Sequence, residues 1–218
     1  MNDVTAIIGA GNIGKTLAGL LSNAGEPVVI AASHVPTDVA EQLGRNVTAA
    51  TVADAIDQSD AVVFAVWLDA LRELIATHGS RLEGKVVIDP SNPVAFDASG
   101  NATRTLPDGV SSGSVVAGLL PASAHYVKAF GTIAAPSLAS AAGRTPNRAV
   151  LFYATDDDVA QAAAERLISA AGFDAVRAGG VDAALRIEML GDLHQFGGLN
   201  GQLLDVAQAR SAVMAASA

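Results

Sequence analysis

The chain is 218 residues long, half of its residues are hydrophobic, and only 16% are charged. A chain of this length and composition buries a substantial core, which excludes disorder as its main state. The net charge of -9 leaves little basic charge for a nucleic-acid-binding face, and without cysteine there are no disulfides, thiolate metal sites or cysteine nucleophiles. No apolar run is long enough to span a bilayer and no signal-peptide pattern opens the chain, so we expect a cytoplasmic protein without nucleic-acid or membrane partners.

The first part of the chain alternates predicted strands with predicted helices. Continuous apolar runs predict strands at residues 4–8, 28–32, 46–49, 61–66 and 85–89. Helical spacing of apolar residues predicts helices between them, at residues 13–24, 37–44, 52–57 and 69–78. This alternation with short connections predicts a doubly wound, mostly parallel sheet of the α/β class.

The second part is less regular. Residues 90–113 are rich in Pro, Asn, Ser, Gly and Asp and predict a long loop, and residues 131–148 form another polar stretch. We expect strands at residues 125–130, 149–154 and 173–177, and helices at residues 114–120 and 159–171. The chain from residue 181 to the end is predicted to be largely helical. We therefore expect one domain at residues 1–155 and a smaller α/β-to-helical part at residues 156–218, which need not be a separate domain.

The most informative motif joins the first strand to the first helix and reads Gly9-Ala10-Gly11-Asn12-Ile13-Gly14. In this setting the first glycine permits a tight turn, and the second lets the backbone approach a pyrophosphate. The third glycine lets helix and strand pack closely, and the helix N–H groups meet the negative charge. The motif therefore predicts that the chain binds a dinucleotide.

A second nucleotide motif overlaps the first. Gly9, Gly14, Lys15 and Thr16 match the GxxxxGK[ST] pattern of phosphate-binding loops, and Asp89 could act as the acid that holds Mg²⁺. A P-loop NTPase is therefore an alternative class. We favour the dinucleotide interpretation, because a further glycine falls at the position that its fingerprint requires.

The end of the second predicted strand bears on the choice between NAD and NADP. NAD sites usually carry an acid there, which binds the ribose 2′-hydroxyl. This chain instead has Ser33 and His34, which could hold a 2′-phosphate, although the nearest cation in the sequence is Arg45. We expect NADP rather than NAD; the alternative is that Ser33 caps the next turn and His34 is an exposed loop residue.

Several segments, in chain order, resemble one family: the glycine-rich turn, Ala65-Val66-Trp67, the Ile-Asp-Pro-Ser-Asn-Pro of residues 88–93, and the Val-Lys-Ala-Phe-Gly-Thr of residues 127–132. The sequence resembles the coenzyme F420-dependent NADP oxidoreductases over most of its length. The resemblance implies a Rossmann-type domain, a C-terminal part that completes the substrate cleft, and hydride transfer between NADP and a deazaflavin or similar planar acceptor. It also implies a homodimer. Where bacterial relatives typically have Ser-Arg and often have Asn, this chain has Ser33-His34 and Gly131.

The family pattern implies site residues position by position. Cofactor contacts are implied for Gly9, Ala10, Gly11, Asn12, Ile13, Gly14, Ser33, His34, Val66, Trp67, Asn92, Pro93 and Ala129. Substrate contacts are implied for Phe130, Gly131 and Thr132, and we add His194. Because the phosphate and glutamates of F420 are strongly anionic, its tail needs cations, for which Lys128, Arg144 and Arg148 are candidates. For Trp67, packing in the core is the alternative to a wall of the cleft.

The chemistry leaves the catalytic residue unassigned, because hydride transfer between stacked rings in a dry cleft needs no protein acid or base. His194 is the candidate for orienting a ring carbonyl or donating a proton, and a structural histidine is the alternative. No metal site is expected, since the histidines lack ligand spacing. The alternative function from another class is a dinucleotide-binding regulatory protein without turnover, which would fill the cleft with side chains.

Overall fold

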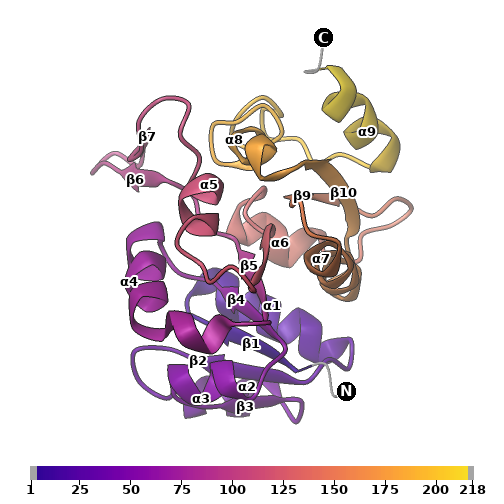
Figure 1. Ribbon diagram of the computed structural model, residues 1–218. Helices are drawn as coiled ribbons and strands as arrows, with labels where there is room; N and C mark the ends of the chain where they lie inside the picture. Colours follow the sequence, from indigo (N-terminus) through magenta and orange to yellow (C-terminus); the bar gives the residue numbers. More distant parts are fainter. Residues whose placement is uncertain (1–3, 216–218) are drawn as a thin grey trace.

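The computed structural model describes residues 4–215, so the ends of the predicted N- and C-terminal parts, residues 1–3 and 216–218, lie outside the described residues. Its centre is an eight-stranded sheet in the order β10-β9-β8-β5-β4-β1-β2-β3 (Figure 1). The strands are β1 (Thr5–Ile8), β2 (Val28–Ala31), β3 (Val47–Ala49), β4 (Ala61–Phe64), β5 (Val86–Asp89), β8 (His125–Lys128), β9 (Val150–Ala154) and β10 (Asp174–Gly179). All neighbours from β3 to β8 pair in parallel, and β9 runs antiparallel to β8. The predicted doubly wound, mostly parallel sheet is confirmed.

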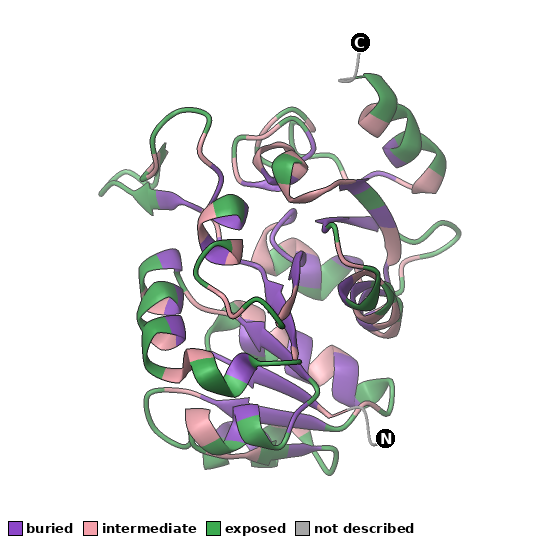
Figure 2. Cartoon of the chain, in the orientation of Figure 1, coloured by how far each residue is buried: buried purple, intermediate pink, exposed green. Residues whose placement is uncertain are grey.

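Helices cover both faces of this sheet. One face packs against α1 (Asn12–Asn23), α2 (Thr37–Leu43), α6 (Ala135–Ala141) and α7 (Asp158–Ala170). The other packs against α3 (Val52–Asp57), α4 (Leu68–His78) and α5 (Ser112–Ala117), and α4 is followed by the short 3-10 helix η1 (Gly79–Leu82). Neighbouring residues of β1 show the division, because Ile7 belongs to the first cluster and Ile8 to the second. Both faces of the central strands are therefore buried, as Figure 2 shows.

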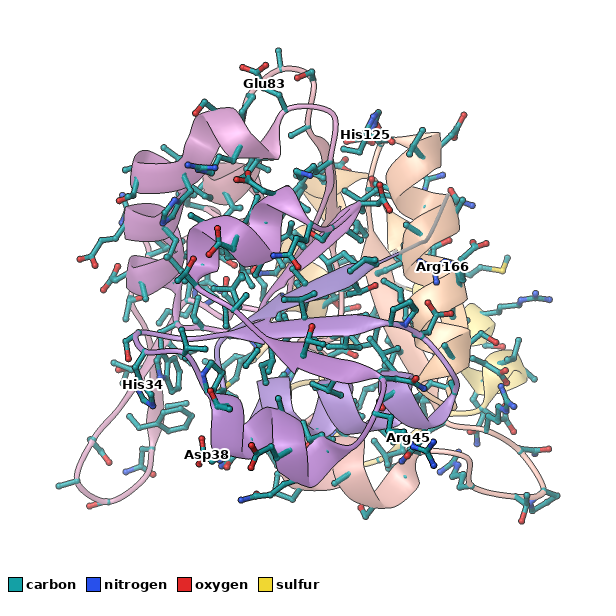
Figure 3. All side chains as sticks on the ribbon, turned by 90° about the horizontal axis from the view of Figure 1, so that it is seen from below. His34, Asp38, Arg45, Glu83, His125 and Arg166 are labelled. Atoms are coloured by element: carbon teal, nitrogen blue, oxygen red, sulfur yellow. The ribbon has the colours of Figure 1, made fainter. Side chains whose placement is uncertain are left out.

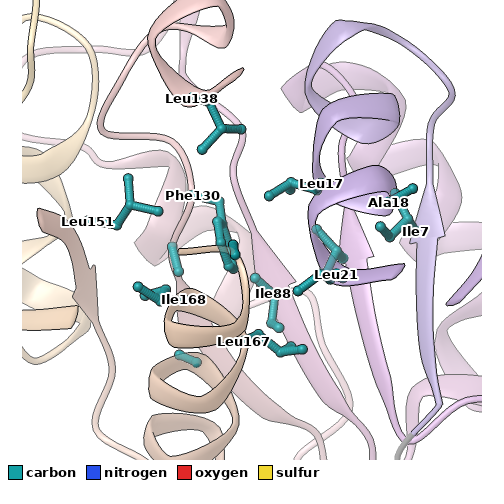
Figure 4. Packing of buried hydrophobic residues seen from close by; sticks show 14 of the residues in the cluster. Ile7, Leu17, Ala18, Leu21, Ile88, Phe130, Leu138, Leu151, Leu167 and Ile168 are labelled. Atoms are coloured by element: carbon teal, nitrogen blue, oxygen red, sulfur yellow. The ribbon is translucent and has the colours of Figure 1, made fainter. Parts of the chain in front are cut away.

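The first of these clusters joins the early and late parts of the chain. Phe130, which follows β8, lies between Leu17 and Leu21 of α1 on one side and Leu167 and Ile168 of α7 on the other (Figure 4). All of these side chains are at most 1% exposed. Helices from both parts of the chain therefore share one continuous core.

The segment predicted as a loop at residues 90–113 contains a β-hairpin. Its strands β6 (Val94–Phe96) and β7 (Ala102–Arg104) pair with each other and project from the sheet (Figure 1). Each strand is only three residues long, which is too short to carry a readable alternation of apolar residues. The polar stretch at residues 131–148 likewise contains α6, which begins with a proline in its first turn.

The C-terminal segment is less helical than predicted. After the 3-10 helix η2 (Val181–Ala183) and the short α8 (Ala184–Ile187), turns lead to α9 (Val206–Ala215). Glycines make these turns tight: a Cβ on Gly197 would lie 1.9 Å from the Gly191 carbonyl oxygen. The segment packs against the second face of β9 and β10 in a third apolar cluster. No helix within residues 4–215 is long and apolar enough to cross a membrane.

Candidate functional site

A cavity of about 1090 Å³ opens at the carboxyl ends of the central strands. Its lining residues come from the loops that follow β1, β4, β5 and β8, from the β6–β7 hairpin, and from the turns between α8 and α9. The loops predicted to bind ligands therefore meet at one edge of the sheet, where open α/β sheets bind ligands.

The glycine-rich turn forms one end of this cavity. Gly9 has a φ of +113°, and a Cβ there would lie 2.3 Å from the Ala65 carbonyl oxygen. A Cβ on Gly14 would lie 1.8 Å from the Gly9 carbonyl oxygen, whereas one on Gly11 would meet nothing within 4 Å. Gly9 and Gly14 are thus required by packing, while Gly11 faces open space in the cavity lining.

The N-terminus of α1 is open to an anion. Its N-cap is Gly11, no side chain caps its first N–H groups, and its first turn carries no acidic residue. Asn12 and Ile13 of this turn line the cavity, whereas Ala10 and Gly14 do not. Unpaired helix N–H groups beside a cavity suit a pyrophosphate.

The overlapping phosphate-loop match is not borne out by the geometry. Helix α1 begins at Asn12, so Gly14, Lys15 and Thr16 are already helical, and the Lys15 backbone N–H donates to the Gly11 carbonyl. No loop remains between strand and helix to wrap a triphosphate. Asp89, the supposed magnesium ligand, is fully buried and bound to other side chains.

Ser33 and His34 are exposed and follow the carboxyl end of β2, outside the cavity lining. Ser33 caps no helix, because the N-cap of α2 is Pro36. Arg45 lies at the opposite end of β2, where the neighbouring Asn46 carbonyl accepts from the Val28 N–H, and Figure 3 shows it far from His34. The nearest cation in the sequence is therefore not near in space.

Trp67 stands in the wall of the cavity and not in the core, since it is 63% exposed. Its ring meets the ring of Phe96 edge to face, with centroids 6.2 Å apart. Val66 also lines the cavity. Phe96 lies on the hairpin that the sequence did not reveal, so no sequence pattern pointed to it.

Asn92 fastens the floor of the cavity. Its Oδ1 accepts from the Met189 backbone N–H at 2.6 Å, and its Nδ2 donates to the Gly131 carbonyl at 3.0 Å. Gly131 also lies close to Pro90, whose carbonyl oxygen would be 2.6 Å from a Cβ on that glycine. One side chain thus joins the loops after β5 and β8 to the turns after α8.

The remaining predicted residues lie outside the lining of the cavity. Ala129, Phe130 and Thr132 are each 1% exposed, and Pro93 is also buried. Phe130 has a φ of +64°, a conformation that side chains rarely adopt and that packing must enforce. These residues position the lining, and their contacts with ligands stay predictions.

His194 lines the cavity although it is only 1% exposed. Its Nδ1 accepts the Phe196 backbone N–H at 3.0 Å, which places the proton of the neutral ring on Nε2. Burial lowers the pKa of His194 from 6.5 to about 4, and a hydrogen bond with the Gly131 backbone only partly offsets this. The ring is therefore an uncharged hydrogen-bond donor at pH 7.

A buried polar network, which was not predicted from the sequence, lies behind the floor of the cavity. Lys128 and Asp89 end neighbouring strands and form an ion pair at 2.8 Å, while the Lys128 Nζ also donates to the Ser91 carbonyl and to the Ser112 Oγ. The Ser112 hydroxyl donates in turn to Glu188 Oε1 at 2.8 Å. Lys128 is 2% exposed and fully engaged, so it is not free for an anionic tail.

The Tyr126 hydroxyl donates to Asp89, and its burial and the nearby carboxylates raise the pKa of this phenol well above 10. Arg144 donates to the carbonyls of Asn147 and Leu203, and neither it nor Arg148 lines the cavity. Within residues 4–215 no group of three His, Asp or Glu side chains could hold a metal ion.

Comparison with known proteins points to the family that the sequence motifs resemble. Residues 4–93, which include the glycine-rich turn and Asn92, match the family described as NADP oxidoreductase coenzyme F420-dependent. Over 199 residues the chain is 27% identical to the F420-dependent NADP reductase of Methanothermobacter marburgensis, covering 86% of this chain and 88% of that one. The chain is therefore similar to this family. The predicted resemblance is confirmed.

Two further proteins are similar to this chain over most of its length. The F420-dependent NADP reductase of Methanothermobacter thermautotrophicus is 29% identical over 199 residues, covering 86% of this chain and 85% of that protein. The crystal structure of a hypothetical protein, SMa0349, from Sinorhizobium meliloti superposes with a TM-score of 0.80 at 31% identity. That match covers 93% of this chain and 95% of the other. The chain therefore has the Rossmann-type fold of NADP-dependent oxidoreductases over nearly its whole length.

Proposed function

We propose that this protein transfers hydride between NADP(H) and a planar acceptor, coenzyme F420 or a related ring. The observation that carries the proposal is the continuity of the cavity. One end is the open N-terminus of α1, and the other is bounded by Trp67, Phe96, His194 and Phe196. A dinucleotide anchored at the first end would reach toward an apolar slot at the second.

The residues present fit the dinucleotide. Gly11 leaves room for the pyrophosphate, and the first-turn N–H groups of α1 can hold its charge without help from a cation. Ser33 and His34 are exposed just after β2, which supports the proposal that they meet the 2′-phosphate. When bound, NADPH supplies the hydride, so this chain needs to bind and orient two rings and to exclude water.

His194 would orient a ring and would not act as a charged acid. Its neutral imidazole presents Nε2–H near the Gly131 carbonyl, at the same corner where Asn92 joins the loops. Both side chains bind the Gly131 backbone, so they hold in place the corner of the apolar cavity against which a planar ligand would lie. Proximity and orientation then supply most of the rate enhancement.

A regulatory protein that binds the dinucleotide without turnover is less well supported. Such a protein would fill the space beside the nicotinamide with side chains. In this chain the cavity of about 1090 Å³ begins at the glycine-rich turn and extends to the hairpin and the turns after α8. The homodimer, the cytoplasmic location and the preference for NADP stay predictions.

A matched pair of glycine variants tests cofactor binding at the turn. Gly11→Val should abolish NADPH binding, measured by quenching of Trp67 fluorescence, with little change in the unfolding midpoint because its Cβ meets no atom within 4 Å. Gly79→Val is the control, because Gly79 also has no neighbour within 4 Å of a Cβ but lies outside the cavity. Undiminished NADPH binding by the Gly11 variant would refute the proposed site.

A further inference from the structure

We propose that the acceptor half of the cavity takes an uncharged planar ring system that carries no anionic tail. This inference rests on the proposed hydride transfer and narrows its substrate class. In the reaction, the ring gains a hydride from NADPH, which leaves as NADP⁺, and a proton from water completes its reduction.

The mouth of the cavity gathers large apolar side chains that are exposed to water. Trp67 is 63% exposed, Phe96 50%, Leu190 49% and Phe196 54%, and all four line the cavity. These residues come from three separate parts of the chain: the loop after β4, the hairpin, and the turns after α8. A contiguous apolar patch around a cavity marks a surface that a ligand covers.

The shape of this patch suits a flat ring. The rings of Trp67 and Phe96 are inclined by 70° to each other, and the rings of His194 and Phe196 by 52° at a centroid distance of 6.3 Å. Aromatic faces and edges of this kind stack against planar ligands. The polar groups Asn92 and His194 lie on the floor, where they can meet one polar edge of the ring.

None of the described residues that line the cavity is Lys, Arg, Asp or Glu. The cationic side chains near the cavity already bind other groups of the protein. Arg104 of the hairpin donates to the Val110 carbonyl at 2.6 Å and pairs with Glu188, and Arg186 pairs with Asp192. Lys15 lies on α1 beyond Asn12, at the dinucleotide end. An anionic tail would therefore meet no cation in the lining of the acceptor half.

Carboxylates stand beside the mouth instead. Asp69 lies next to the lining residue Ala70, and its side chain is 91% exposed with only Arg72 as a partner, at 3.8 Å. Asp97 follows Phe96, and hydrogen bonds from Asn101 lower the pKa of its carboxyl group. Together with the net charge of -9, these groups repel an anion that approaches the mouth.

Two matched pairs of ligands test this inference by binding and by turnover. The first pair is oxidised F420 and the deazaflavin nucleoside that lacks its phosphate and glutamates, and the second is FMN and riboflavin. Equilibrium binding is followed by Trp67 fluorescence, with free N-acetyltryptophanamide as the control for absorption by the ligand. The uncharged member of each pair should bind at least about tenfold more tightly at low salt. Added salt should strengthen binding of the anionic member only, because it screens repulsion.

A variant that lacks the Asp69 charge tests whether repulsion at the mouth of the cavity weakens the binding of anionic ligands. Asp69→Asn should improve binding of the anionic ligands about threefold and leave the uncharged ligands unchanged. Glu83→Gln removes the same charge at the amino ends of the strands, and should change neither (Figure 3).

The outcomes distinguish this inference from the proposed function. If NADPH reduces F420 with a kcat/KM equal to or above that of the tail-free nucleoside, or if salt weakens F420 binding, the inference fails and hydride transfer stands. If NADPH binds but reduces neither member of either pair, both fail.

Discussion

His194 is the one titratable side chain in the described lining of the cavity, and its environment sets what it can do. The Phe196 N–H occupies its Nδ1, and burial holds its pKa at about 4. The sequence could place a histidine in an apolar segment with glycines. It could not predict which ring nitrogen carries the proton, because that depends on turns that form only when the segment folds.

The lowered pKa predicts how stability depends on pH. Because the unfolded chain takes up a proton at His194 near pH 6.5 and the folded chain only near pH 4, this stability is complete above pH 6.5 and is lost as the pH falls toward 4. The loss is on the order of 3 kcal/mol. In His194→Asn the amide oxygen can accept the Phe196 N–H without titrating. Urea unfolding at pH 7 and pH 4 should show the larger loss in the wild type, and equal losses would contradict the assignment.

At the cofactor end, we propose that His34 decides between the two dinucleotides. We expect NADPH to bind more tightly than NADH, and His34→Arg to improve NADPH binding about tenfold, because a guanidinium pairs with a phosphate in two hydrogen bonds. Arg45→Ala is the control and should change nothing, since Arg45 lies at the other end of β2. Equal or tighter binding of NADH by the wild type would contradict the preference for NADP.

Among the elements, the β6–β7 hairpin departs most from the sequence prediction. It brings Phe96 to Trp67 and is tied to the body of the protein by Arg104, which lies 3.6 Å from Glu188 Oε2. Helices and strands with continuous or periodic apolar residues, such as α1 and β4, could be predicted directly from the sequence. Three-residue strands in a polar segment could not, because their stability comes from contacts distant in sequence.

Arg104 should therefore stabilise both the hairpin and the buried carboxylate. Glu188 is fully buried, and its Oε2 has no hydrogen-bond partner within the described part of the chain. Arg104→Leu should lower the free energy of unfolding by about 2 kcal/mol, because it leaves a buried charge without its cation. Adding Glu188→Gln, which keeps an acceptor for Ser112, should restore part of the loss. A double-mutant cycle in urea measures this, and strictly additive effects would show that the two side chains are not coupled.

For the whole molecule, a mostly parallel sheet with both faces covered was predictable from the alternation of apolar runs, whereas the order of its strands was not predicted. The boundary predicted at residue 155 separates elements that pack together in the structure. Strand β9 pairs along its length with β10 but meets β8 at a single register position, and α7 shares its core with α1. We propose that residues 1–155 and 156–218 fold as one unit.

Truncation tests this proposal. A fragment of residues 1–155 should not unfold cooperatively, because it loses the strand beside β9 and the helix that covers Phe130. The full chain should unfold in a single transition by circular dichroism and by Trp67 fluorescence. A fragment with a sharp transition of its own would show that the first part is an independent domain.

The net charge of -9 limits how the whole molecule meets its ligands. Long-range attraction cannot draw in an anionic dinucleotide, so we propose that binding depends on the backbone of the glycine-rich turn and on Ser33 and His34. At the other end of the cavity the same charge works against an anionic acceptor. The central claim is that the cavity joins these two ends so that hydride passes between two bound rings.

Anaerobic mixing of the protein with NADPH and an oxidised deazaflavin tests that claim most directly. We expect loss of the deazaflavin absorbance with an equal amount of NADP⁺ formed. The reduction should be faster with the tail-free nucleoside than with F420. If Trp67 fluorescence shows that NADPH is bound, yet neither deazaflavins nor flavins are reduced, the protein is not the oxidoreductase proposed.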